Sequence, residues 1–336
     1  MKKILITVAM IAAIVMSSCS KNEVLDPENS NLISFKTYNS QTTKVVEDVT
    51  LDQLKANGFN VQGRLTAGGV QFMKERNVTW GTAWTYDGAT MYWPADGNID
   101  FLAVNRDNAQ AKMGKISSFL GDTTAPTVTY SQAAAVAAQK DLVIAYAPNS
   151  AKGSNGAVAL KFKHALSKIS ATVKAQSTDL TFKLKVNSIT FKTVQPKGVC
   201  TISENTTAAT PFAWVASETG DDLALGLTAT PVEIAGIASP IFTDVLKATE
   251  GHAMIIPQAM TSIVIDGIWE QTVDGKTVVV DDFSGANAKT VTLTGVWAAN
   301  EHYTYNFTII PNVTAITFTV DVVDNWEAIT SAHEIK

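Results

Sequence analysis

Val158-Ala-Leu-Lys-Phe-Lys-His-Ala-Leu-Ser-Lys-Ile-Ser-Ala-Thr-Val173 contains two runs of alternating apolar residues that are out of phase with each other. The first run is Val158, Leu160 and Phe162, and the second, after His164, is Ile169, Ala171 and Val173. Alternation with a period of two is the pattern of a strand with one buried face. A change of phase without a turn residue indicates a β-bulge, or a strand that bends into a second packing environment. We therefore predict one long bent strand here, close to the seam between two β domains.

The composition favours an all-β protein with two domains. Of the 336 residues, 46% are hydrophobic and 17% are charged, so the chain has enough apolar residues to form a core. A chain of this length is too long for one core, and we therefore expect two domains. Valine, threonine, isoleucine and aromatic residues recur in short runs that Gly, Asn and Asp separate, as in β proteins. The net charge is −5 and the Lys and Arg residues form no cluster, which argues against nucleic acid as a partner.

The N-terminus has the features of an export signal. Two lysines precede the apolar residues 4–16, a run too short to cross a bilayer as a stable helix, and Ser17-Ser18-Cys19 follows. Small residues before a cysteine resemble a lipobox, in which the cysteine is lipidated and becomes the mature N-terminus. An ordinary secretory signal is the alternative. We predict a signal peptide at 1–18, lipidation at Cys19 and a tether at 19–31.

Turn residues and apolar alternation predict the elements of the first half of the chain. A short helix follows the capping residue Thr50 and ends at Asn57-Gly58. A hairpin is predicted over residues 80–93 with its turn at Asp87-Gly88, and one or two helical turns over residues 131–140. Strands are predicted at 32–38, 59–65, 99–104 and 142–147.

The second half of the chain begins after residue 176 with strictly alternating apolar residues at 180, 182, 184 and 186. Asp274-Gly275 predicts a hairpin turn, and further strands are predicted at 263–269, 277–280, 291–296 and 303–309. Repeated short strands are typical of Greek-key sandwiches and not of a parallel sheet. We therefore predict an N-terminal domain at 32–176 and a C-terminal domain at 177–336.

Several pieces of the sequence, taken in order, resemble a known family. The motif V-x-L-x-F-x-H-A-L-S-K-I at 158–169 is similar to a segment of the fimbrillin-like lipoproteins of Bacteroidales, the type V pilins and their relatives. The other matching pieces are Trp93-Pro94, Asn98-Ile-Asp-Phe-Leu-Ala103, Asp141-Leu-Val-Ile-Ala-Tyr-Ala147, Met254-Ile-Ile-Pro-Gln258 and Trp297-Ala-Ala-Asn-Glu-His-Tyr-Thr-Tyr-Asn306. The resemblance covers most of the chain. It implies two tandem transthyretin-like Greek-key β-sandwich domains with minor short helices.

The resemblance also implies a function: a structural or adhesive subunit of a type V pilus, exported to the cell outer membrane. In such a protein a trypsin-like protease cuts the lipidated precursor after its first strand, and a donor strand from another subunit takes the vacant place. The candidate processing site is Lys44, with Arg64 as the alternative. The implied partners are other pilin subunits, the outer membrane before processing, and a ligand on a host or bacterial surface.

The candidate donor strand lies in the tail 313–336. Its apolar residues are Ile316, Phe318, Val320, Val322 and Trp326. The first four alternate with polar residues, as expected for a strand that presents one apolar face to a groove. The alternative is that this segment is the last strand of its own domain and that the final residues fray.

No group of residues in the sequence predicts catalysis or metal binding. A nucleophile elbow, a zinc-protease motif and a phosphate-binding loop are all missing, so we predict neither an enzyme nor a cofactor. Asp274, Asp281 and Asp282 lack the spacing of a calcium loop. Cys200 has no partner for a disulfide framework, and we interpret it as a small buried residue. No metal-ligand spacing surrounds the histidines, which are His164, His252, His302 and His333.

One group of aromatic residues leaves a second function open: Trp80, Trp84, Tyr86, Tyr92 and Trp93. If their rings were exposed together they would form a stacking platform for sugars. The protein would then be a surface glycan-binding lipoprotein of a polysaccharide uptake system. On alternating strands, however, an aromatic cluster is more typical of a core. Burial of the tryptophans would therefore argue for the pilus subunit.

Overall fold

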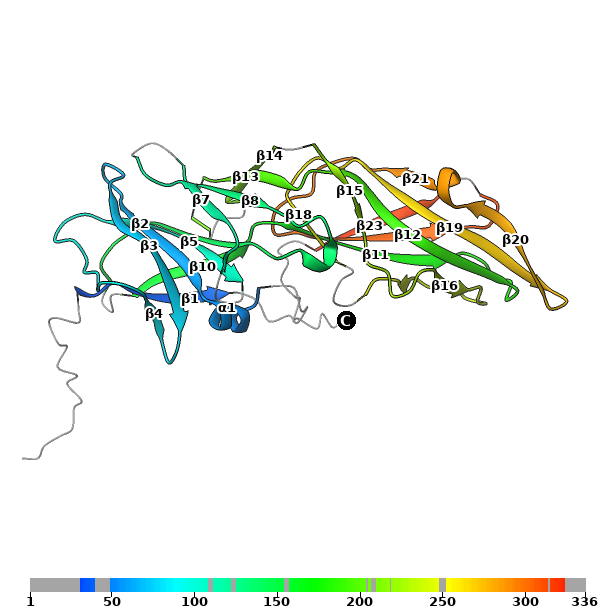
Figure 1. Cartoon of the computed structure of the whole chain (residues 1–336), viewed down its shortest axis with the longest axis horizontal. Coiled ribbons are helices and arrows are strands. Elements are labelled where there is room, and N and C mark those ends of the chain that lie inside the picture. Colours follow the sequence, from blue (N-terminus) through cyan, green and yellow to red (C-terminus); the bar gives the residue numbers. More distant parts are fainter. Residues whose placement is uncertain are drawn as a thin grey trace, which may run out of the picture.

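The described strands form four sheets in an elongated molecule, with the N-terminal sheet at one end and the C-terminal strands at the other (Figure 1). The computed structural model describes residues 31–39, 49–107, 111–121, 125–153, 157–203, 205–206, 210–217, 219–247, 252–313 and 315–323. Within these residues most regular elements are strands, which confirms the predicted all-β class. No helix in this part of the chain is long and apolar enough to cross a membrane. The tandem transthyretin-like arrangement stays a prediction.

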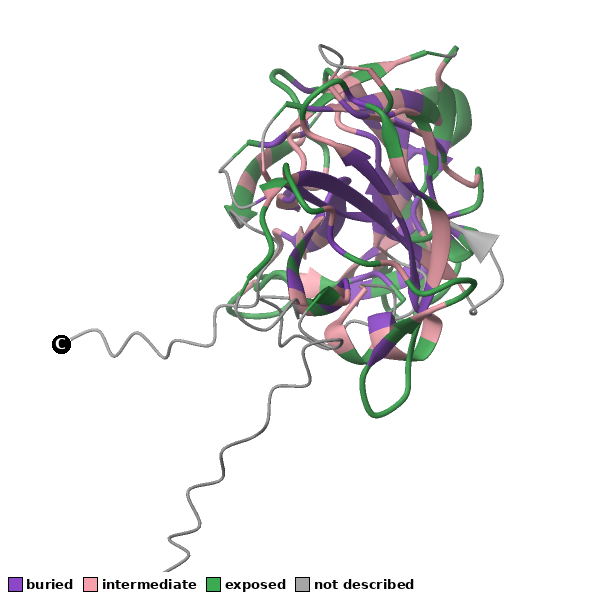
Figure 2. Cartoon of the chain, turned by 90° about the vertical axis from the view of Figure 1, so that its left-hand side faces the viewer, coloured by how far each residue is buried: buried purple, intermediate pink, exposed green. Residues whose placement is uncertain are grey.

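The N-terminal sheet has eight strands, in the order β1-β10-β9-β5-β2-β3-β4 with β6 beside β5. Seen from this end of the molecule, buried strands lie inside an exposed rim (Figure 2). Helix α1 (Leu51–Asn57) contacts β3 and β5, and Thr50 and Gln53 form a capping box at its start. The strands are β1 (Ser34–Asn39), β2 (Phe59–Leu65), β3 (Gln71–Trp80), β4 (Trp84–Tyr86), β5 (Ile99–Asp107), β6 (Ala111–Lys112), β9 (Val143–Ser150) and β10 (Ala157–His164).

The C-terminal half contains two sheets that share one apolar core. The five-stranded sheet has β17 (Thr243–Asp244), β11 (Ser167–Ala175), β22 (His302–Ile309) and β23 (Thr317–Val323) in order, with β18 (Ala253–Ile255) beside β11. The six-stranded sheet has β15 (Asp221–Ala224), β12 (Phe182–Val194), β19 (Ser262–Val273) and β20 (Lys276–Phe283) in order, with β16 (Val232–Ala235) beside β12 and β21 (Lys289–Thr292) beside β19. A short 3-10 helix, η3 (Gly285–Asn287), follows β20. Both sheets contribute large buried rings, including Trp269 and Phe307, so their inner faces pack together.

A four-stranded sheet joins parts of the chain from both sides of residue 176. Its order is β14 (Phe212–Ala216), β13 (Lys197–Ile202), β8 (Thr127–Ser131) and β7 (Lys115–Ser118). The core at this sheet includes Leu102, Leu166 and Cys200. Burial raises the pKa of the Cys200 thiol, as expected for a structural cysteine. The division into 32–176 and 177–336 stays a prediction, but this core is shared across it.

The stretch 158–173 forms two strands, β10 and β11, where we predicted one continuous strand. The break falls at Ala165 and Leu166, and Ala165 N donates to the carbonyl oxygen of Leu142. Before the break β10 pairs with β9 in the N-terminal sheet, and after it β11 pairs in parallel with β22. The apolar phase therefore shifts because the chain passes from one sheet to another.

Of two predicted hairpin turns, one is confirmed and one is wrong. At Asp274-Gly275 both residues have positive φ, 48° and 73°, and they join β19 directly to β20, which confirms the predicted hairpin. The hairpin predicted around Asp87-Gly88 is wrong, because the chain turns earlier, between Trp80 and Trp84. The predicted helical turns at 131–140 reduce to one 3-10 turn, η2 (Val136–Ala138).

Candidate assembly site

Strand β1 and the residues just before it are held by two other parts of the chain. β1 pairs with β10 in parallel, from Ser34 opposite Ala157 to Asn39 opposite Phe162. Just before β1, Ile33 N donates to Met91 O at 3.0 Å, and Trp93 N donates to Asn31 O at 2.8 Å. The other strand pairs of this sheet are antiparallel. Because β1 is the first described strand, its removal would cut no covalent connection between the remaining ones.

The side chains of β1 fill an aromatic slot. Phe35 is buried, and its ring makes edge contacts with Tyr86 at 5.9 Å and Phe101 at 5.5 Å between centroids. Thr37 accepts a hydrogen bond from Trp84 Nε1 at 3.0 Å. Ile33 is buried beside the same core. Burying one isoleucine and one phenylalanine stabilises by about 3–6 kcal/mol, so the slot would be a strong acceptor for another strand of the same pattern.

A buried polar network anchors the chain where it returns to the core after residues 40–48. Asp141 Oδ2 accepts from Val49 N at 3.0 Å and lies 2.6 Å from His164 Nδ1. The side chain of Asn105 bonds the backbone on both sides of residue 142: it donates to Asp141 O and accepts from Val143 N, both at 3.0 Å. Asp141 and His164 are both buried, so the carboxylate needs these donors. The anchor does not involve β1, and a cut within 40–48 would leave it in place.

This network was not predicted from the sequence, although the sequence contains one signal of it. His164 stands at the inward position that continues the series Val158, Leu160 and Phe162, where an apolar residue was expected. A polar residue at a buried position needs a partner. Asp141 precedes a buried strand, but its contact with His164 depends on the pairing of β9 with β10.

Replacing Asp141 with asparagine is expected to lower the free energy of unfolding by about 2–3 kcal/mol, because the buried donors of Val49 and His164 lose their charged acceptor. Urea unfolding followed by tryptophan fluorescence measures the change. Asp96→Asn, at an exposed position, is the matched control and should change stability by less than about 0.5 kcal/mol. Equal effects of the two variants would contradict the anchoring role.

The candidate processing sites differ in their surroundings. Arg64 lies within β2 and is buried, with Nε 2.9 Å from Asp100 Oδ2 and Nη1 donating to the carbonyl oxygens of Phe119 and Gly121. A protease needs an extended, accessible segment, so this placement argues against cleavage after Arg64. Lys44 lies outside the described residues, as does the predicted lipidation site Cys19.

The candidate donor strand is part of its own sheet in this structure. Among the described strands β23 lies at the sheet edge and pairs with β22, from Thr308–Thr317 to His302–Val323. Phe318 and Val320 of this strand, and Ile316 just before it, are partly buried against the C-terminal core, and Val322 is exposed. Trp326 lies outside the described residues. The inward face of β23 is therefore less buried than that of β22, whose Tyr305 and Phe307 are fully covered.

The aromatic residues considered as a sugar platform do not form one. Trp84 and Trp93 are 8% and 6% exposed and belong to the N-terminal core. Trp80 is 39% exposed, with the ammonium of Lys55 4.8 Å from its ring centroid. Tyr86 packs against the core, and Tyr92 is exposed. With two of the three tryptophans buried, the surface lacks the row of open rings that the glycan-binding hypothesis needs.

The histidines and acidic residues that the structure describes form no catalytic or metal-binding group. Burial, helped by the nearby Lys168, lowers the pKa of His252 to about 4 and that of His302 to about 3. Both rings are therefore neutral at physiological pH. Within the described ranges no group of three His, Cys, Asp or Glu side chains could hold a metal ion. Asp281 and Asp282 lie on β20, and His333 is outside the described residues.

The sequence profile of the fimbrillin-like family matches residues 34–326, and the chain belongs to this family. The chain is also similar to the crystal structure of a fimbrial protein from Bacteroides vulgatus, with a TM-score of 0.64 and 19% identity over 88% of this chain and 99% of the other. A protein assigned to cell adhesion from Bacteroides uniformis gives a TM-score of 0.44 and 17% identity over 87% and 97% of the two chains. No curated protein matched the sequence. As a member of the fimbrillin-like family, the protein is a pilus or adhesin subunit of the cell surface and not an enzyme.

Proposed function

We propose that this chain is exported as a lipoprotein and polymerises into a type V pilus by donor-strand exchange. The observation that carries the proposal is the position of β1, an N-terminal parallel strand seated in an aromatic slot of an otherwise antiparallel sheet. Loss of β1 would expose Phe59, Tyr86 and Phe101 together with the unpaired edge of β10. An exposed edge beside apolar pockets is a template for an incoming strand.

The incoming strand in this proposal comes from the C-terminal segment 313–336 of the next subunit. β23 carries apolar side chains at alternate positions, like Ile33 and Phe35 around the start of β1, and among the described strands it has a single partner. Because β23 is the last described strand, no described strand after it would have to move with it. When β23 moves to the next subunit, it loses its contacts with β22 and gains contacts in the slot that β1 has left. The filament is stabilised because apolar side chains are buried more deeply in that slot.

Export in this proposal begins with lipidation at Cys19, which tethers the precursor to the outer membrane. A protease then cuts at Lys44, within the nine residues 40–48 that separate β1 from the Val49 anchor. The cut frees β1 from α1 and leaves both the capping box and the Asp141 network intact. The processed subunit would be held in the filament by its neighbours and no longer by its lipid.

Mass spectrometry of filaments sheared from the producing cells is expected to find a mature N-terminus at Val45, and none at Cys19. Lys44→Gln should block the cut and leave lipidated monomers on the cells. Lys36→Gln, a lysine substitution within β1, is the control and should be processed normally. An N-terminus at Cys19 in assembled filaments would rule out removal of the first strand and favour an anchor role.

A further inference from the structure

Among the described strands, β14 lies at one edge of the four-stranded sheet, so one of its two sides has no neighbouring strand. Among the described strands it pairs with β13 only, from Ile202–Phe212 to Gly198–Ala216. Ser203 N donates to Pro211 O and Ser217 N donates to Lys197 O. The backbone N–H and C=O groups of the odd-numbered residues between 211 and 217 are therefore directed at β13. Because backbone groups alternate in direction along a strand, the N–H and C=O groups of Phe212, Trp214 and Ala216 point outward.

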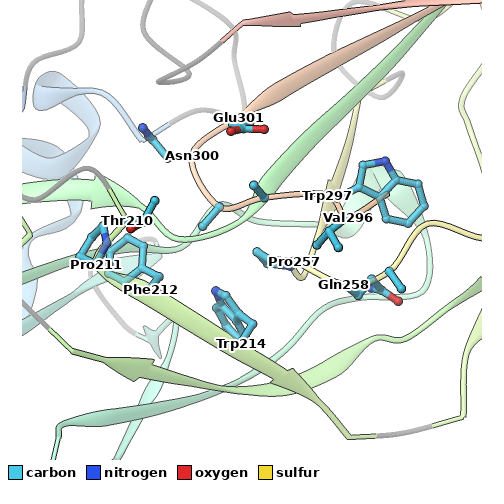
Figure 3. Close-up of a pocket in the computed structure, with 13 residues that line it drawn as sticks. Thr210, Pro211, Phe212, Trp214, Pro257, Gln258, Val296, Trp297, Asn300 and Glu301 are labelled. Carbon is cyan, nitrogen blue, oxygen red and sulfur yellow. The ribbon is translucent and has the colours of Figure 1, made fainter. Parts of the chain in front are cut away.

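A hollow of about 560 Å³ lies beside this edge. Phe212 and Trp214 line it from β14, and residues 257–259 and 296–301 line it from the C-terminal half (Figure 3). Trp214 is fixed in place because its Nε1 donates to the carbonyl oxygen of Ala165 at 2.7 Å. A strand added to β14 would therefore place every second side chain in the hollow. The residues between them would lie on the face of Val215, which is 67% exposed.

The larger polar side chains around the hollow are engaged within the protein. Gln258 donates to Gln195 O and Ile256 O and accepts from Gln195 N. The indole N–H of Trp297 donates to Tyr305, and Glu301 accepts from Tyr303. Sugars are recognised by planar polar side chains with free donors and acceptors, so these residues do not favour a sugar. The outward backbone groups of β14 offer donors and acceptors at the spacing of a strand instead.

We propose that β14 and this hollow form a docking site for an extended strand of another polypeptide. The strand carries apolar residues at the alternate positions that enter the hollow and polar residues between them. It also carries Lys or Arg at the end that reaches Glu301, the charged residue of the lining. The site lies apart from the β1 slot, so its test does not depend on how the subunits polymerise.

The test measures binding of the synthetic peptide Thr-Val-Thr-Val-Thr-Val-Thr-Arg to the full chain. Two further peptides carry backbone N-methyl groups, one on its three valines and the other on the three threonines that come after the first residue. Alternate backbone donors are thereby blocked in each peptide. Since alternate N–H groups face β14, one methylated peptide should bind at least about tenfold more weakly while the other binds like the parent. Equal binding by both methylated peptides would overturn the proposal.

Hydrogen exchange locates the bound peptide. With ¹⁵N-labelled tryptophan and alanine, the amides of Trp214 and Ala216 should exchange more slowly in the complex, while Ala213 N–H, already directed at β13, should change little. No slowing at Trp214 and Ala216 would also overturn the proposal.

Substitutions along the edge and at the charged end complete the test. Ala216→Pro removes one outward donor without touching the ladder to β13 and should weaken binding, whereas Val215→Thr is its control. Glu301→Gln should weaken binding about threefold, and should not affect a peptide that ends in Gln. If Ala216→Pro binds the parent peptide as tightly as Val215→Thr does, the edge of β14 is not the docking site.

Discussion

A disulfide between β22 and β23 is expected to stop the processed protein from polymerising. Thr308 and Thr317 stand opposite each other in this strand pair, and cysteines at both positions would tie β23 to its own sheet. If β23 is the donor, the locked subunit cannot supply it, so polymer should be lost almost completely. The measurement is electron microscopy and gel analysis of the processed protein, before and after a reductant. Reduction should restore polymerisation.

The matched control places the same lock elsewhere. Thr272 and Thr277 are also opposed threonines, on the hairpin of β19 and β20, with their hydroxyl oxygens 3.0 Å apart. Cysteines there should leave polymerisation unchanged. If the lock at 308 and 317 also leaves polymerisation unchanged, β23 stays in its own sheet. Deletion of residues 324–336 then tests whether the donor is the segment C-terminal to β23.

Truncating Phe35 to alanine is expected to lower the stability of the unprocessed protein by about 3–5 kcal/mol, because a buried ring in contact with Phe59, Tyr86 and Phe101 is replaced by a cavity. Urea unfolding followed by tryptophan fluorescence reports the change, since Trp84 and Trp93 belong to the same core. After proteolytic cutting, β1 of this variant should also leave its slot faster than the natural strand.

Tyr92→Ala is the control for the Phe35 variant. Tyr92 is an aromatic residue that bridges to Leu32, just before β1, but its side chain is 53% exposed. Its truncation should change stability by less than about 0.5 kcal/mol. If Phe35→Ala is as mild as Tyr92→Ala, β1 is not a main source of stability for the N-terminal sheet, and the driving force for strand exchange at this slot would be too small.

Local signals predicted several elements because the forces behind them act within a few residues. The capping box at Thr50 and Gln53 and the positive-φ turn at Asp274-Gly275 need no distant partner. The hairpin at 80–93 was misplaced because Asp87-Gly88 is a turn signal of the same kind. Asp87 instead accepts hydrogen bonds from Asn77 of β3, and so holds the end of β4 against that strand. The competing turn between Trp80 and Trp84 depends on cross-strand packing that a short window does not contain.

The all-β class, the fimbrillin-like family and the positions of most strands could be predicted from the amino-acid sequence, because alternation and turn residues are local features of the chain. The assignment of strands to sheets required the three-dimensional structure. The shift of phase after His164 marks a change of sheet, and β13, which carries β14 at its other side, pairs with β8 from before residue 176. The Asp141–His164 contact and the free edge of β14 depend on the same pairings. Strand pairing joins residues far apart in sequence, and each strand's own pattern shows only that one face is buried, not what covers it.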